Sequence, residues 1–121
     1  MKLNHQRLAA LALSVGTGIG ALGMGLLPML AAAADPEFTI VIKDHVFTPS
    51  EVKVPAGTKV KLVVDNQDAT AEEFESKDLK REKVIPPRSK GTFVIGPLKP
   101  GRYKFVGEFH EKTAQGVVIA E

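Results

Sequence analysis

Residues 51–68, EVKVPAGTKVKLVVDNQD, contain two strand-like runs separated by a tight break. In the second run, TKVKLVVD (58–65), two lysines alternate with Val60, Leu62 and Val64, which is the period of a strand with one face in a core. The first run, residues 51–54, alternates in the same way and stops at a Pro-Ala-Gly break. Asn66-Gln-Asp68 supplies the next turn. This stretch therefore predicts two β-strands joined by a short turn.

Similar runs lie on both sides of this stretch. We expect further strands at residues 38–43, 83–85, 92–95, 102–109 and 116–120, with turns at 47–50 and 99–102. Residues 69–81 are rich in charge and fit a short helix, a loop or an irregular strand. Seven or so short strands with Gly and Pro turns between them are typical of an all-β sandwich.

The first 34 residues differ from the rest of the chain. Basic residues at the start precede an apolar, Gly- and Ala-rich stretch from Leu8 to Ala34, which ends in four alanines before Asp35-Pro36. A basic start, an apolar middle and a small-residue site indicate a secretory signal peptide, residues 1–34, cleaved after Ala34. The alternative is an uncleaved membrane anchor, because the run is long enough to span a bilayer. We expect an exported, periplasmic domain at residues 35–121.

The composition of residues 35–121 excludes several classes of function. The 16 basic residues of the chain include Lys2 and Arg7, and the remaining 14 balance the 14 acidic residues, so no basic surface for nucleic acid is expected. The chain has no cysteine, which excludes disulfides and thiolate metal sites. Its three methionines all lie before residue 30. A type 1 copper site needs two His and one Cys, usually with a Met, so this domain cannot form one.

A series of motifs resembles the cupredoxin-like family of small exported β-sandwiches. The series is Phe47-x-Pro49, Val54-Pro-Ala-Gly57, Val60-x-Leu62, Asn66-x-Asp68 and Pro100-Gly-x-Tyr103-x-Phe105, and it covers nearly the whole domain. The resemblance implies a Greek-key β-sandwich. It also implies where the family's copper ligands would lie.

At those positions this chain departs from the family. Glu72 stands where the family has its first histidine ligand, Gly107 replaces the cysteine, and Ala114 replaces the methionine, while His110 is retained. The segments Glu-Glu-Phe-Glu (72–75) and Gly-Glu-Phe-His-Glu (107–111) resemble those of periplasmic cupredoxin-like proteins that accompany bacterial iron-permease uptake systems. That narrower resemblance implies a role in handling iron, with copper as a further possibility, and a membrane iron permease or another subunit of its uptake system as the partner.

The donor types agree with hard-metal chemistry. Carboxylates with an imidazole suit iron, manganese or zinc better than Cu(I). The candidate metal ligands are His110, Glu72, Glu73, Glu75 and Glu108. Each glutamate has an alternative as ordinary solvated surface, and His110 as a histidine bonded to a loop carbonyl. His110 reaches the family's ligand position only if the strand breaks after Gly107, because residues 108 and 110 of a continuous strand share a face.

Two hypotheses compete. The first is an exported metal-binding module that handles iron. The second is a metal-free interaction module in which the fold persists and the charged loops dock a membrane transport or redox partner. An Fe(II) oxidase has less support without cysteine and methionine, and no hydrolytic triad stands out. His45, beside a turn, is expected to be an exposed residue, with a role as a second-site ligand as the alternative.

Overall fold

The computed structural model describes residues 34–121, and the predicted signal peptide, apart from Ala34, lies outside the described residues. The described part contains nine strands and one short 3-10 helix. They are β1 (Glu37–Lys43), β2 (Val46–Thr48), β3 (Glu51–Val54), β4 (Val60–Asn66), β5 (Glu72–Ser76), β6 (Arg81–Ile85), β7 (Ser89–Ile95), β8 (Gly101–Gly107), η2 (Glu108–His110) and β9 (Gln115–Ala120). Within residues 34–121, no helix has the length and apolar character needed to cross a membrane.

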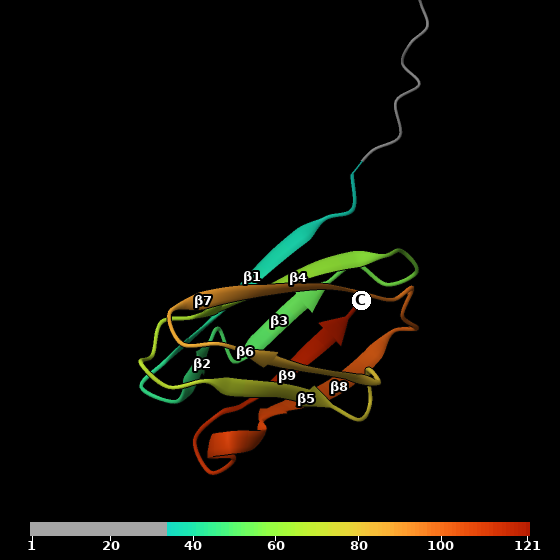
Figure 1. The fold of residues 1–121 in the computed structure, drawn as a ribbon. Helices are drawn as coiled ribbons and strands as arrows, with labels where there is room; N and C mark the ends of the chain where they lie inside the picture. Colours follow the sequence, from blue (N-terminus) through green and yellow to red (C-terminus); the bar gives the residue numbers. More distant parts are fainter. Residues whose placement is uncertain (1–33) are drawn as a thin grey trace, which may run out of the picture. The chain divides into compact units, whose positions relative to one another are not determined.

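The strands form two sheets that face each other, so the predicted all-β sandwich is confirmed (Figure 1). One sheet has the order β2-β1-β4-β7 and the other β3-β9-β8-β5-β6. Two of the pairings, β1 with β4 and β3 with β9, are parallel, and the others are antiparallel. Strands β5 and β8 are neighbours in the second sheet, which brings the two segments with the candidate ligands together.

The core lies between the sheets and is built on the alternation seen in the sequence. Val60, Leu62 and Val64 of β4 are fully buried, as predicted, whereas Lys61 is partly exposed; Val63, on the other face of the strand, is also buried. Three phenylalanines from both sheets meet in the middle: the ring centroid of Phe47 lies 5.1 Å from that of Phe105, which lies 5.0 Å from that of Phe74. Aromatic pairs at this spacing add to the stability that burial of their area provides.

Three local predictions need correction or completion. Residues 46–48 form β2, so Phe47 and Thr48 belong to a strand and not to the predicted turn. Residues 69–81 contain strand β5 followed by a turn. The buried Ser76 hydroxyl fixes this turn, because it donates to the Lys104 carbonyl (2.6 Å) and accepts from the Leu79 amide (3.0 Å). The predicted strand 102–109 ends at Gly107, where η2 begins.

Candidate metal centre

Glu72 and His110 form a close pair at one end of the sandwich. The side chain of Glu72, the first residue of β5, is almost fully buried, with 3% of its surface exposed, and that of His110 is 30% exposed. The Nδ1 atom of His110 lies 2.9 Å from Oε2 and 3.3 Å from Oε1 of Glu72. Nδ1 of an imidazole can donate a hydrogen bond to a carboxylate oxygen, so His110 gives the buried Glu72 side chain the polar partner that its burial requires.

Gly107 makes the room that the Glu72 carboxyl group occupies. A Cβ atom at position 107 would lie 2.7 Å from Cδ of Glu72 and 2.7 Å from Cβ of Ala114, well inside ordinary contact distance. The backbone is also fixed at this point, because the Gly107 amide donates to the Ala114 carbonyl at 2.8 Å. Glu72, Gly107, His110 and Ala114 therefore converge, and the missing side chain at Gly107 is a condition for the buried carboxylate.

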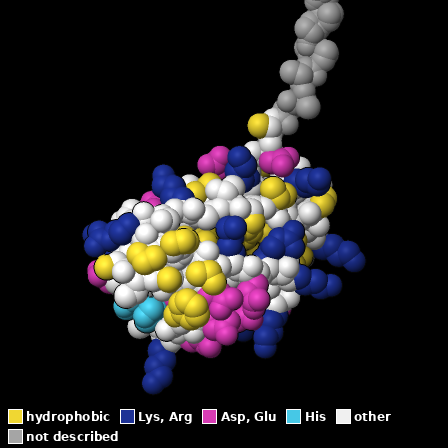
Figure 2. All heavy atoms as spheres, viewed as in Figure 1, with side chains coloured by type: hydrophobic (Ala, Val, Ile, Leu, Met, Phe, Trp, Pro, Cys, Tyr) yellow, Lys and Arg dark blue, Asp and Glu magenta, His cyan; other side chains and the backbone are white. Residues whose placement is uncertain are grey.

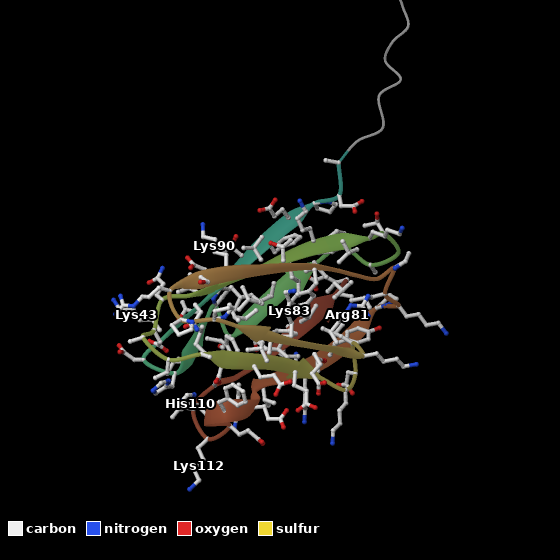
Figure 3. All side chains as sticks on the ribbon, viewed as in Figure 1. Lys43, Arg81, Lys83, Lys90, His110 and Lys112 are labelled. Atoms are coloured by element: carbon white, nitrogen blue, oxygen red, sulfur yellow. The ribbon has the colours of Figure 1, made fainter. Side chains whose placement is uncertain are left out.

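The strand ends at Gly107, as it must if His110 is to occupy the ligand position. Strand β8 ends there, and residues 108–110 form the 3-10 turn η2. The carbonyl of His110 accepts from the amides of Thr113 (3.2 Å) and Ala114 (2.9 Å), which closes the loop before β9. The turn separates the directions of neighbouring side chains, so His110 meets Glu72 while Glu108 lies elsewhere. Figure 3 shows His110 on η2 at the end of the sandwich.

The loop before β5 is held by Asn66, which is fully buried. Its amide nitrogen donates to the carbonyls of Thr70 (2.9 Å), Ile85 (3.1 Å) and Pro86 (3.1 Å). Its side-chain oxygen accepts from the Asp68 amide at 3.0 Å. These bonds set the path of the chain into β5 and so the position at which Glu72 enters the core.

The other predicted ligands lie on the opposite face of β5. Successive residues of a strand point to opposite faces, so Glu72 points into the core and Glu73 and Glu75 point out. Oxygen atoms of Glu73, Glu82 and Glu108 lie within 4.8 Å of one another. We call Glu73, Glu75, Glu82 and Glu108 the outer carboxylates; Figure 2 shows acidic side chains gathered on this face.

The outer carboxylates repel one another. The pKa of Glu108 is raised to about 7, first by its hydrogen bond with Glu75 and the negative charge of that residue, then by partial loss of solvent and by Glu73. Glu75 also lies directly opposite Glu82 in the β5–β6 pair. Within residues 34–121 none of the four forms an ion pair with a lysine or arginine. This group is therefore open to a cation or a proton.

The five predicted ligands thus fall into two groups. Glu72 and His110 meet inside the end of the sandwich, whereas Glu73, Glu75 and Glu108 lie outside with Glu82, which the sequence interpretation did not select. The strand period could have separated Glu72 from its neighbours once β5 was known to start at residue 72. Glu82 could be recognised as a member of the outer group only from the pairing of β5 with β6.

The sequence interpretation also missed the position of His45. Its side chain is 40% exposed, as expected for a turn residue, but its ring stacks on that of His110, with centroids 3.6 Å apart and planes 11° apart. Its Nδ1 atom lies 3.4 Å from Oδ2 of Asp68. In Figure 2 histidine side chains lie together at the surface, beside hydrophobic side chains. No signal in the sequence connects His45 with a loop so distant along the chain.

Comparison with known proteins places this fold. The chain is 51% identical over 83 residues to an uncharacterized protein of Rickettsia prowazekii (strain Madrid E), a match that covers 69% of this chain and 66% of the relative. Among solved structures it resembles auracyanin B, with a TM-score of 0.64 and 12% identity over 76% of this chain and 93% of the other. It also resembles the metal-binding domain of a Cu(I)-exporting P-type ATPase of Streptococcus pneumoniae D39, with a TM-score of 0.63 and 13% identity over 70% and 84% of the two chains.

The two structural likenesses have low sequence identity and show the fold alone. The match to the family is direct, because residues 10–120 match the cupredoxin-like domain. It agrees with the two-sheet topology and with the motifs along the chain. The chain belongs to the cupredoxin-like domain family.

Proposed function

We propose that this chain is an exported metal-binding protein that handles iron, with copper as the second candidate, through a carboxylate–histidine centre made by Glu72 and His110. The observation that carries this proposal is the 2.9 Å separation of Glu72 Oε2 and His110 Nδ1. Two neighbouring ligands of one ion, each bonded at about 2.1 Å and at a right angle, have donor atoms about 3 Å apart. An ion that displaces the shared proton would therefore find both donors in place.

The donor chemistry supports a hard or borderline ion. One carboxylate and one imidazole suit Fe(II), Fe(III) or Cu(II), and the domain offers no thiolate or thioether that would favour Cu(I). Only two protein donors meet at this centre, which leaves positions for water or for a group on a partner. A centre with open positions suits a protein that passes its ion on. Two structural neighbours, the metal-binding domain of the Cu(I)-exporting ATPase and a copper-binding protein solved in its apo form, support copper as the alternative cargo.

Three of the outer carboxylates, Glu73, Glu75 and Glu108, have a secondary role in this proposal. Their mutual repulsion, seen in the raised pKa of Glu108, would be relieved by a bound cation. Glu75 and Glu108 border a hollow of about 510 Å³, which a hydrated ion can enter. We assign them weaker binding than the buried pair, because exposed carboxylates bind through water.

The parts of the proposal that concern export and a membrane partner rest on the sequence. The basic start and apolar stretch of residues 1–34 support secretion into the periplasm. The resemblance of the 72–75 and 107–111 segments to proteins of iron-permease uptake systems supports a membrane permease, or another subunit of that system, as the receiver of the ion. The metal-free docking module is the alternative that the following experiment tests.

The test is calorimetric titration of the chain without residues 1–34, which keeps the entire described core. The chain is titrated with Fe(II) under anaerobic conditions and separately with Cu(II). The variants Glu72→Gln and His110→Ala should each weaken saturable binding by about tenfold or more, because each removes one ligand. Glu51→Gln, an exposed glutamate on β3, is the matched control and should bind like the wild type.

Two further results separate the groups of carboxylates and test the proposal as a whole. Glu73→Gln and Glu108→Gln should affect only a weaker second phase of binding. If neither Fe(II) nor Cu(II) binds saturably, or if binding is indifferent to both Glu72→Gln and His110→Ala, the metal-handling proposal is wrong and the docking module is the better account.

A further inference from the structure

The tip of the β1–β2 hairpin has an unusual composition. Lys43 pairs with Val46, so Asp44 and His45 form a two-residue loop, and both have positive φ, 54° and 60°. Positive φ at both positions is the mark of a type I′ turn, for which Asp-Gly or Asn-Gly is the favoured sequence. Here an imidazole stands where glycine would be free of strain. A bulky residue held in this region of backbone space is a reason to look for a function of its side chain.

Asp68 holds the strained tip in place. Its Oδ1 atom accepts from the Asp44 amide at 2.6 Å, and its Oδ2 atom accepts from the His45 amide at 3.0 Å. Partial burial would raise the pKa of Asp68, but these two amides and the neighbouring histidines outweigh it and lower the pKa. The carboxylate thus stays charged and bonded to the hairpin. Asp68 is itself bonded through its amide to the buried Asn66, which ties the hairpin to the loop that leads to Glu72.

The ring that this turn presents lies flat on the ring of His110. The centroids are 3.6 Å apart and the planes are 11° from parallel. Rotation of the His110 ring about its Cβ–Cγ bond would drive it into His45. The stack therefore fixes the plane of the His110 ring, and the hydrogen bond with Glu72 selects the ring orientation in which Nδ1 faces that carboxylate. Imidazole lone pairs lie in the ring plane, so the two parallel rings direct their lone pairs along parallel planes and not toward one shared ion. Among the described residues, His45 does not form a set of three close donors with Glu72 and His110.

We propose that His45 is a positioning residue of the metal centre: the strained hairpin tip, held by Asp68, keeps the imidazole of His110 in the plane from which Nδ1 reaches Glu72. This proposal rests on the proposed function for its consequence, metal retention, but its structural content stands in the metal-free protein. A ligand held in one orientation binds an ion more tightly, because less freedom is lost when the ion enters. Groups that orient a ligand in this way typically change metal affinity by about 10–100-fold when they are removed.

Two substitutions separate positioning by the ring from coordination by its nitrogens. His45→Gly removes the ring and relieves the strained φ, so the fold should be retained. His45→Phe keeps a flat ring and removes both nitrogens. We expect Fe(II) or Cu(II) affinity to fall by about tenfold in His45→Gly and to stay within about threefold of the wild type in His45→Phe. If both variants lose affinity equally, His45 acts through its nitrogens and the positioning role is wrong.

A second measurement reads the orientation without any metal. Long-range ¹⁵N–¹H correlation spectra of the metal-free chain at one fixed pH report which nitrogen of His110 carries the proton. The wild type and His45→Phe should show His110 protonated at Nδ1, and His45→Gly should show a mixture of tautomers. An unchanged His110 signal in His45→Gly would overturn the proposal. Because this reading needs no metal, failure of the chain to bind Fe(II) or Cu(II) would count against the proposed function and not against the positioning of His110.

Discussion

Gly107→Ala tests whether the missing side chain at position 107 is what allows Glu72 to reach His110. The new Cβ atom would lie 2.7 Å from Cδ of Glu72, whereas carbon atoms pack at about 3.5–4.0 Å, so the carboxyl group must retreat by about 1 Å. If the carboxyl group moves away from His110, a shift of this size stretches the 2.9 Å contact to nearly 4 Å, which is too long for a hydrogen bond.

The cost follows from two effects. Overpacking a tight site costs about 1–3 kcal/mol, and loss of a hydrogen bond to a charged group costs about 1.5–3 kcal/mol. We therefore expect Gly107→Ala to lower the free energy of unfolding by about 3 kcal/mol. A domain of this size is stable by roughly 4–13 kcal/mol, so the variant should still fold at 25 °C.

The assay is urea unfolding followed by far-ultraviolet circular dichroism, since the chain has no tryptophan and only one tyrosine to serve as a fluorescent probe. Glu72→Ala removes the carboxyl group that Gly107→Ala displaces, so the double variant should be more stable than the sum of the two single changes predicts, by at least about 1 kcal/mol. Gly116→Ala is the matched control, because its Cβ would press on the Phe105 ring and not on Glu72. Additive effects of Gly107→Ala and Glu72→Ala, to within about 0.5 kcal/mol, would refute this reasoning.

Three further predictions concern the surroundings of the centre. Asn66→Asp replaces the buried amide donor with a carboxylate oxygen that faces three backbone carbonyls, and it should lower the free energy of unfolding by about 3 kcal/mol or more, measured in urea; a loss below about 1 kcal/mol would contradict the role of Asn66. Ser76→Ala leaves the Leu79 amide without its acceptor and should cost about 1–3 kcal/mol in the same assay, with no change in metal affinity. The pKa of Glu108 is raised to about 7 from 4.5, chiefly by Glu75, so between these pH values the folded state holds a proton that the unfolded state has lost. Stability of the metal-free protein should therefore fall as the pH rises from 4.5 to 7, and Glu108→Gln should make that fall shallower; identical pH profiles would rule this out.

Much of the fold follows from local pattern. The alternation around Val60 and Leu62 predicts a strand with one buried face, and both residues are fully buried in β4. The misjudged segments are those in which the pattern is short or interrupted. Residues 46–48 make only three strand positions before the Pro49 break, and residues 102–109 look continuous although the chain turns after Gly107. In both places tertiary contacts decide between extended chain and turn.

The sequence by itself determined which chemistry the domain can carry. Without cysteine, and with methionine confined to the first 34 residues, a metal centre in residues 35–121 has no sulfur ligand, and its strongest side-chain donors are carboxylates and imidazoles. It also placed Glu72 and His110 in segments that a cupredoxin-like sandwich brings together. Composition and motif spacing are local properties, so they are readable without a structure.

Only the tertiary structure decided which of these donors meet. The register of β5 sends Glu72 into the core and Glu73 to the outer face, and the pairing of β5 with β6 adds Glu82 to the outer group. The stacking of His45 on His110 depends on a hairpin tip and a 3-10 turn that are far apart along the chain. Side-chain direction and long-range proximity arise from the packing of two sheets, and that packing minimises a free energy to which every strand contributes; no single segment of sequence encodes it.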